Sequence, residues 1–177
     1  MTRRELGLEI YKISLLQGEF KLRSGIISNE YFDKYQFESQ PRLLREIARS
    51  LTTMLPDDFD LLGGLETGGI PLATAIALEI DKPIIFVRKK AKDYGTMKLA
   101  EGPNIEGKNV IVVEDVVTSG GQVRQSIEDL RHLGAICNIA ICVIDREQGG
   151  KENLSKIGVE LRSLFTMSEL KSFLQNI

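Results

Sequence analysis

The residues best suited to chemistry form one short stretch, VIVVEDVVTSGGQ, at positions 110–122. Its apolar, β-branched start is typical of a buried strand in a parallel sheet. The strand runs into an acidic pair, Glu114 and Asp115. Carboxylates at the carboxyl edge of such a strand can accept hydrogen bonds from two ribose hydroxyls, so we predict a ribose site at this edge.

The residues after the acidic pair favour a phosphate. Thr118 and Ser119 offer hydroxyls, and the glycines that follow let the backbone approach an anion closely. Gln122 begins a helical pattern whose free N–H groups and dipole favour negative charge. An ordinary glycine-rich turn with solvated acids remains the alternative. The predicted sugar-phosphate site consists of Glu114, Asp115, Val116, Val117, Thr118, Ser119, Gly120, Gly121 and Gln122.

A second glycine-rich stretch, GGLETGGIP at positions 63–71, also lies between an expected strand and an expected helix. Its glycines allow unusual backbone angles and close approach of an anion. A tight turn that needs glycine only for its geometry is the alternative. Gly63 and Gly68 have the spacing of the two glycines of a P-loop, but Gly69 and Ile70 follow in place of Lys and Ser or Thr. The sequence G-x-G-x-x-G, another nucleotide-binding motif, does not occur. We therefore predict a different diphosphate site, on the backbone amides of Glu66, Thr67, Gly68 and Gly69.

Residues 88–107 form a long polar segment without hydrophobic periodicity. Loops of this length in compact domains are usually functional or disordered. A flexible cationic loop could close over a diphosphate and exclude water, whereas a solvated run of charges is the alternative. The cations at its start are Arg88, Lys89, Lys90, Lys92 and Lys98.

A third candidate is Arg146, between Asp145 and Glu147 at the end of another expected strand. The planar guanidinium matches a carboxylate, so we predict a ligand carboxylate here, with a surface ion pair to Asp145 or Glu147 as the alternative. His132 is the only histidine, which excludes a Ser-His-Asp triad and a His/Cys metal cluster, and we interpret it as structural.

Composition indicates one ordinary globular domain. The chain has 177 residues, 42% of them apolar and 27% charged, with a net charge of -2. This charge gives no reason to expect nucleic-acid binding, and the absence of a long apolar run excludes a membrane segment. We expect a cytoplasmic protein. Cys137 and Cys142 are expected as reduced thiols on opposite faces of one strand.

Apolar spacing predicts an alternating α/β chain. A first helix should end at Gly18, two short strands should follow over residues 20–33, and a helix should run from Pro41 to before Pro56. Strands are expected at 61–64, 83–87, 110–113, 136–144 and 159–165, with helices at 70–79, 122–133, 150–156 and 167–174. The pattern predicts a mostly parallel central sheet flanked by helices.

The 110–122 stretch resembles the signature of the type I phosphoribosyltransferases. Three further segments, FKLRSGIISNEYFD (20–33), VRKKAKDYG (87–95) and VIDREQGG (143–150), more narrowly resemble the orotate phosphoribosyltransferases. The resemblance spans most of the chain. It implies transfer of ribose 5-phosphate from 5-phosphoribosyl 1-diphosphate to orotate in pyrimidine (UMP) biosynthesis, with Mg²⁺. It also implies a homodimer that shares the catalytic loop 88–107 across its interface, and an N-terminal hood over about residues 1–35.

The resemblance also implies residue roles. Lys92, Arg88 and Asp115 would be catalytic, and Arg88, Lys89, Lys92 and Tyr94 would bind the diphosphate. Orotate would be bound by Thr118, Arg146 and Arg23, whereas Mg²⁺ would be held mainly by substrate and water, with no direct protein ligand.

The chain departs from the family at several of these positions. Many relatives carry Lys where Gly68 stands and His where Tyr94 stands. Arg23 replaces a common Lys, and Ser28-Asn29 replaces a common Ser-Pro. Two alternatives stay open: a phosphoribosyltransferase for another base, and a non-catalytic regulator on the same fold that binds RNA or a nucleotide effector.

Overall fold

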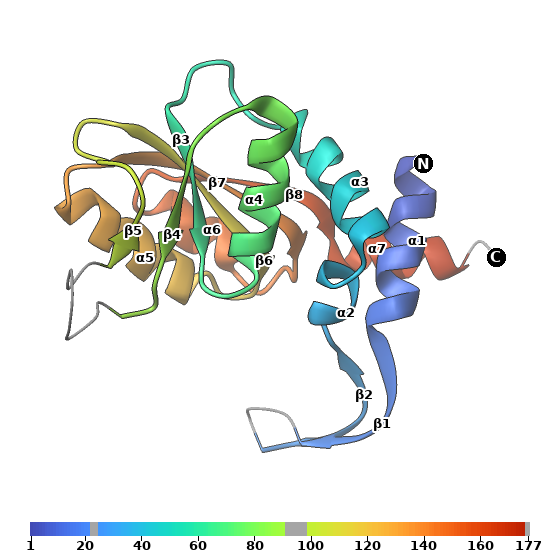
Figure 1. Ribbon diagram of the computed structural model, residues 1–177. Coiled ribbons are helices and arrows are strands. Elements are labelled where there is room, and N and C mark those ends of the chain that lie inside the picture. Colours follow the sequence, from blue (N-terminus) through green and yellow to red (C-terminus); the bar gives the residue numbers. More distant parts are fainter. Residues whose placement is uncertain (22–24, 91–98, 176–177) are drawn as a thin grey trace.

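The computed structural model describes residues 1–21, 25–90 and 99–175, and a six-stranded β-sheet forms its centre (Figure 1). The strands are β3 (Leu61–Leu65), β4 (Ile84–Val87), β5 (Ala100–Glu101), β6 (Asn109–Val117), β7 (Ile136–Asp145) and β8 (Glu160–Thr166). Their order across the sheet is β5-β4-β3-β6-β7-β8. All neighbours are parallel except β4 and β5.

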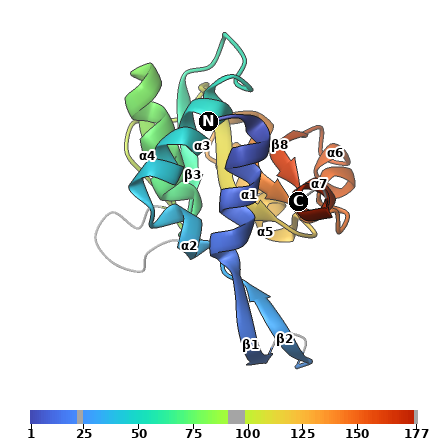
Figure 2. The same ribbon diagram turned by 90° about the vertical axis from the view of Figure 1, so that its right-hand side faces the viewer.

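Helices cover both faces of the sheet, which confirms the predicted α/β fold. One core cluster joins the sheet to α1, α3, α4 and α7, and the other joins it to α5 and α6. Figure 2 shows α4 and α6 on opposite sides of the strands. The helices are α1 (Arg3–Ser14), α2 (Tyr35–Glu38), α3 (Pro41–Thr52), α4 (Gly69–Ile80), α5 (Gly121–His132), α6 (Gly150–Ser155) and α7 (Met167–Gln175). None of the helices in the described ranges is long and apolar enough to cross a membrane.

The strand that carries the acidic pair is longer than the sequence predicts. β6 continues to Val117 because Val116 and Val117 still pair with Ile144 and Asp145 of β7. The acidic pair therefore lies within the part of β6 that still pairs with β7, rather than in a loop. This placement buries both carboxyl groups against the neighbouring elements.

A two-stranded hairpin projects from the body of the molecule below α1 (Figures 1 and 2). Its strands are β1 (Leu15–Lys21) and β2 (Ile27–Phe32). The predicted helix end at Gly18 is wrong, since α1 ends at Ser14 and Leu15 already pairs with Phe32. Gly18 instead lies where the strand register shifts. Helix α2 and the short strand β5 were not predicted, because four and two residues are too short to show a period.

The two cysteines are free and buried, as predicted, but they lie on the same face of β7. An irregularity in the pairing of β6 with β7 falls between Ile136 and Ile139. The extra residue reverses the alternation of side chains, so Cys137 and Cys142 pack in one core cluster. Burial raises the pKa of Cys137 to about 11, so this thiol stays protonated at neutral pH.

The order of the strands creates a switch point between β3 and β6. From β3 the chain continues to β4 on one side, whereas β6, β7 and β8 extend on the other side. In open α/β sheets, ligands bind in the crevice outside the carboxyl ends of strands at such a point. The loops that open there are the β3–α4 loop (residues 66–68) and the β6–α5 loop (residues 118–120).

Candidate active site

The β3–α4 loop packs directly on the end of β6. A Cβ atom built on Gly69 would lie 2.2 Å from the carbonyl oxygen of Val113, and one built on Gly68 would lie 1.6 Å from Asp115 Oδ2. Gly68 has an ordinary helical φ of -70°. At Gly68, glycine is therefore needed for the close approach of Asp115 and not for an unusual backbone angle.

The acidic pair is buried at this junction. Asp115 is fully buried and Glu114 is 8% exposed. The backbone N–H of Val116 donates to Asp115 Oδ1 at 2.5 Å, and the N–H of Asp115 donates to Glu114 Oε1 at 2.9 Å. The ammonium of Lys34, just after the hairpin, lies 2.6 Å from Asp115 Oδ2. The pair therefore has a fixed geometry before any ligand binds.

Burial and the ammonium of Lys34 shift the pKa values of three neighbouring carboxyl groups, those of Glu38, Glu114 and Asp115. Burial, together with hydrogen bonding to Asp115, raises the pKa of Glu38 to about 9. Burial, with the charge of Asp115, also raises the pKa of Glu114 well above its usual value. For Asp115, burial alone would raise the pKa, but hydrogen bonds from Glu114, Glu38 and Lys34 outweigh burial and lower it. Of the three carboxyl groups, Asp115 is therefore the one whose lowered pKa favours the ionised form.

The β6–α5 loop has the form of an anion cradle. Gly120 has a φ of +74° and precedes α5, whose first turn carries free N–H groups. Thr118 and Ser119 are exposed beside it. Asn153 Nδ2 of α6 donates to the carbonyl oxygen of Ser119 at 2.8 Å and holds the loop from behind. The structure thus brings together the predicted residues of positions 114–122.

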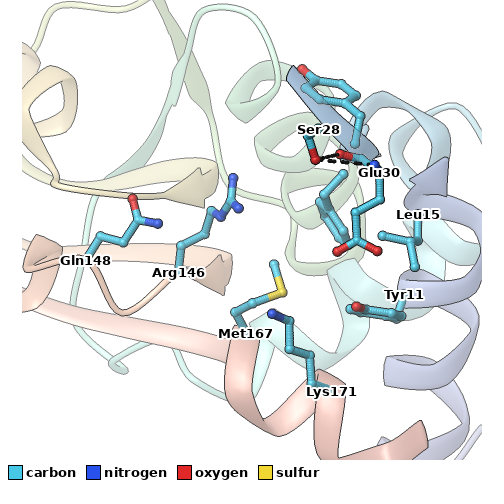
Figure 3. A pocket seen from close by; sticks show the side chains of 10 residues that line it. Tyr11, Leu15, Ser28, Glu30, Arg146, Gln148, Met167 and Lys171 are labelled. Atoms are coloured by element: carbon cyan, nitrogen blue, oxygen red, sulfur yellow. Dashed lines mark hydrogen bonds between the residues drawn. The ribbon is translucent and has the colours of Figure 1, made fainter. Parts of the chain in front are cut away.

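Arg146 lines a pocket of about 490 Å³ between the hairpin and the end of the sheet. Its backbone N–H donates to the carbonyl oxygen of Val117 at 2.8 Å, which joins this pocket to the ribose-phosphate side. In Figure 3, Arg146 and Lys171 point into the space that Glu30 faces from β2. The pocket is lined by Tyr11, Leu15, Ser28, Glu30, Tyr31, Phe32, Arg146, Gln148, Met167 and Lys171.

The alternative role for Arg146, a surface ion pair, is not seen within the described part of the chain. Asp145 Oδ1 accepts the backbone N–H of Glu147 at 2.9 Å. The carboxylate of Glu147 accepts from the backbone N–H and hydroxyl of Ser168, at 2.8 and 2.7 Å, and so caps α7. Both acidic neighbours therefore organise the turn, and the guanidinium faces the pocket.

The start of the cationic segment lies next to the β3–α4 loop. The backbone N–H of Lys89 donates to Glu66 Oε2 at 3.0 Å, and Arg88 pairs with Glu101 at 3.8 Å. Its far end is more regular than predicted, because β5 pairs with β4 and Ile105 is buried in the core. Of the predicted site residues, Arg23, Lys92 and Tyr94 lie outside the described residues.

Sequence reasoning missed several residues that border these sites, among them four with ionisable side chains. Lys34 and Glu38 approach Asp115, whereas Tyr11 and Lys171 line the pocket. Neither pair belongs to a motif. Tyr11 and Lys171 are 160 positions apart in the sequence, and only the packing of α1 beside α7 brings them to one place.

The fold and these loops define an α/β protein with a candidate phosphate-binding site at the switch point of its sheet. Residues 35–163 match the phosphoribosyl transferase domain. The orotate phosphoribosyltransferase of Nocardioides sp. is 48% identical over 93% of this chain and 92% of its own. The orotate phosphoribosyltransferase of Methanocaldococcus jannaschii is 41% identical over 88% of each chain. The crystal structure of the Mycobacterium tuberculosis orotate phosphoribosyltransferase, solved in complex with 5-phospho-α-D-ribosyl 1-diphosphate, superposes with a TM-score of 0.82 at 27% identity. The superposition covers 96% of this chain and 98% of the Mycobacterium tuberculosis chain. The chain therefore belongs to the phosphoribosyltransferase family, and within it to the orotate phosphoribosyltransferases.

Proposed function

We propose that this chain transfers the ribose 5-phosphate of 5-phosphoribosyl 1-diphosphate to orotate, giving orotidine 5'-phosphate and diphosphate. The reaction belongs to pyrimidine nucleotide biosynthesis. The observation that carries the assignment is the junction at Val117, where the ribose-phosphate loop and the Arg146 pocket share a backbone hydrogen bond of 2.8 Å. A sugar phosphate and a carboxylated base would thus meet at one strand end.

Each part of the donor substrate has a proposed partner. The carboxyl groups of Glu114 and Asp115 would bind the ribose hydroxyls, and residues 118–122 would bind the 5'-phosphate at the start of α5. The amides of residues 66–69 would bind the diphosphate, with Arg88, Lys89, Lys92 and Tyr94 from the cationic segment. Thr118, Arg146 and Arg23 would bind orotate, the carboxylate lying on the guanidinium of Arg146.

The reaction is a displacement at the anomeric carbon. A ring nitrogen of orotate forms a bond to the anomeric carbon while the bond from this carbon to the diphosphate oxygen breaks, and the sugar develops oxocarbenium character. The diphosphate leaves with the bonding electrons, and the proton of the ring nitrogen is released to the diphosphate or to water. No protein nucleophile is required. The chain would contribute by positioning the two substrates, by cations on the leaving group and by exclusion of water.

Magnesium fits the chemistry of this site. The available ligands are carboxylate and phosphate oxygens, which Mg²⁺ prefers, and Asp115 is already paired with Lys34. We propose that Mg²⁺ is held mainly by the diphosphate and water. When bound, it would neutralise charge on the departing diphosphate.

We further propose that residues 1–177 act as one phosphoribosyltransferase domain, with residues 1–35 as a hood. The projecting hairpin, which borders the Arg146 pocket through Ser28 and Glu30, supports this role. Two copies would form a homodimer in which the segment 88–107 serves the neighbouring site. The cytoplasmic location stays a prediction.

The test is orotate consumption, followed by ultraviolet absorbance, with 5-phosphoribosyl 1-diphosphate and Mg²⁺. Adenine, hypoxanthine, xanthine and uracil are the comparison bases. We expect turnover of orotate alone. Turnover of a different base would keep the ribose-phosphate site and refute the role of Arg146, whereas binding without turnover would favour a regulator.

A further inference from the structure

Lys34 and Glu38, to which the sequence analysis assigned no role, both lie next to Asp115. Lys34 and Glu38 come from the short segment that joins the hairpin to α3, and Glu38 is 7% exposed. The side chain of Lys34 is 33% exposed and contacts the fully buried Asp115. A buried carboxyl group next to the ribose site needs a structural explanation, since burial of ionisable groups is costly.

We propose that Lys34 and Glu38 are positioning residues, which orient the Asp115 carboxylate for the ribose hydroxyls in space that Gly68 leaves open. This inference rests on the proposed function, because it assigns to these residues the binding of 5-phosphoribosyl 1-diphosphate. They act through Asp115 and do not take part in bond formation.

The space next to Gly68 is bordered by both Asp115 and Glu38, and Lys34 approaches it as well. A Cβ atom at position 68 would lie 1.6 Å from Asp115 Oδ2 and 2.7 Å from Glu38 Oε1. The two carboxyl oxygens therefore border the same small space, which the Lys34 ammonium approaches at 2.6 Å from Asp115 Oδ2. Any side chain at position 68 would displace this arrangement.

The closeness of the two carboxyl groups favours a proton on one of them. Glu38 Oε1 and Asp115 Oδ2 are both buried, and neither makes a well-aligned hydrogen bond among the described residues, although the Lys34 ammonium lies 2.6 Å from Asp115 Oδ2. Two facing carboxylate oxygens repel each other, whereas a protonated Glu38 can donate to Asp115. The raised pKa of Glu38, caused by burial and by hydrogen bonding to Asp115, agrees with this state. Such a proton would let Glu38 hold Asp115 Oδ2 together with Lys34, while the N–H of Val116 holds Oδ1.

The segment that carries these residues is itself anchored. The backbone N–H of Asp33 donates to the carbonyl oxygen of Ser14 at 2.8 Å. The Asp33 carboxylate accepts from the N–H of Tyr35 at 3.1 Å and from Gln36 Nε2 at 2.8 Å. Lys34 is therefore held where the hairpin meets the body, and it connects the base side of the site to the ribose side.

The test compares substitutions that keep or remove each hydrogen bond. Lys34→Gln removes the charge and Lys34→Arg keeps it, whereas Glu38→Gln keeps a donor and Glu38→Ala removes it. Lys108→Gln is the matched control, because Lys108 pairs with Asp60 at 3.5 Å at the opposite end of β3 and β6. The readouts are KM for each substrate, kcat, the melting temperature, and calorimetric binding of 5-phosphoribosyl 1-diphosphate with Mg²⁺.

We expect Lys34→Gln and Glu38→Ala to raise KM for 5-phosphoribosyl 1-diphosphate by about tenfold or more, the loss expected for a hydrogen bond to a charged group. KM for orotate should change less than about twofold, as should every constant of Lys108→Gln. Lys34→Arg and Glu38→Gln should recover most of the loss. Equal changes in both KM values, or no change, would overturn the proposal.

Calorimetry separates this proposal from the proposed function. If the wild-type protein does not turn over orotate, the proposed function fails, yet folded Lys34→Gln should still bind 5-phosphoribosyl 1-diphosphate about tenfold more weakly than wild type. Unchanged binding in that variant would refute the positioning role whatever the activity. Loss of binding in Glu38→Gln equal to that in Glu38→Ala would refute the proton on Glu38.

Discussion

The two halves of the candidate site are built in different ways. The half that we propose for ribose and phosphate comes from one continuous stretch at the end of β6 and the start of α5. The half that we propose for the base is assembled from α1, the hairpin, the turn after β7, and α7. The first half is held by backbone hydrogen bonds and close glycine contacts, whereas the second depends on side chains from separate elements. Substitutions in the first half should therefore affect the donor substrate, and those in the second should affect the base.

The largest effect is expected for Asp115→Asn, in the continuous half. The amide cannot replace the ionised carboxylate toward the ribose hydroxyls, and it weakens the contact with Lys34. Loss of hydrogen bonds to a charged group should lower kcat/KM for 5-phosphoribosyl 1-diphosphate roughly 100-fold. Steady-state kinetics measure this change, with the exposed Asp57→Asn as a control that should behave as wild type. An unchanged kcat/KM would remove Asp115 from the site.

The next effect is expected for Arg146→Ala, in the assembled half. KM for orotate should rise by about 10- to 100-fold, because a charge-assisted contact with the carboxylate is lost, while KM for the donor substrate stays within about twofold. Any slow reaction with uracil, which lacks the carboxylate, should not change. Arg146→Lys should recover only part of the loss, since the bidentate geometry is gone. A larger change for the donor substrate than for orotate would contradict the division into halves.

Thr118→Val should have a smaller effect on both substrates, because Thr118 lies where the halves meet. Loss of one neutral hydrogen bond predicts a rise of about two- to tenfold in each KM. Thr118→Ser keeps the hydroxyl and should restore both constants. A change confined to one substrate would assign Thr118 to that half alone.

A separate effect is expected on the dependence of stability on pH. Glu38 faces Lys34, Asp115 and Asp33, and its pKa is raised to about 9 by burial and by hydrogen bonding to Asp115. The unfolded chain therefore releases this proton near pH 4.5 and the folded chain near pH 9, so Glu38 makes the protein progressively less stable across that range. Glu38→Gln should flatten the decline in urea-unfolding free energy between these pH values. An unchanged slope would show that Glu38 is ionised in the folded protein.

Much of the fold could be read from local patterns. The apolar runs at β3, β6 and β7 and the stripes of α3 and α5 extend over several residues, so five of the six strands of the sheet and the longer helices around it were predicted. The patterns failed where pairing with a distant strand decides the outcome. Leu15 and Leu16 lie in a strand rather than in the predicted helix because they pair with Phe32 and Tyr31. The cysteines share a face because of an irregularity in the pairing of β6 with β7.

In the candidate site, too, local motifs could be predicted and contacts between distant segments could not. The sequence by itself determined which segments are candidates, namely the predicted ribose-phosphate loop, the predicted diphosphate loop and Arg146, because each is a local motif whose residue types suit the chemistry. Only the tertiary structure decided that Gly68 is required by the proximity of Asp115, and that Lys34 and Glu38 hold this carboxylate. Contacts between residues far apart in the chain depend on how the strands are ordered and packed. The spacing of residues along one segment does not determine that order.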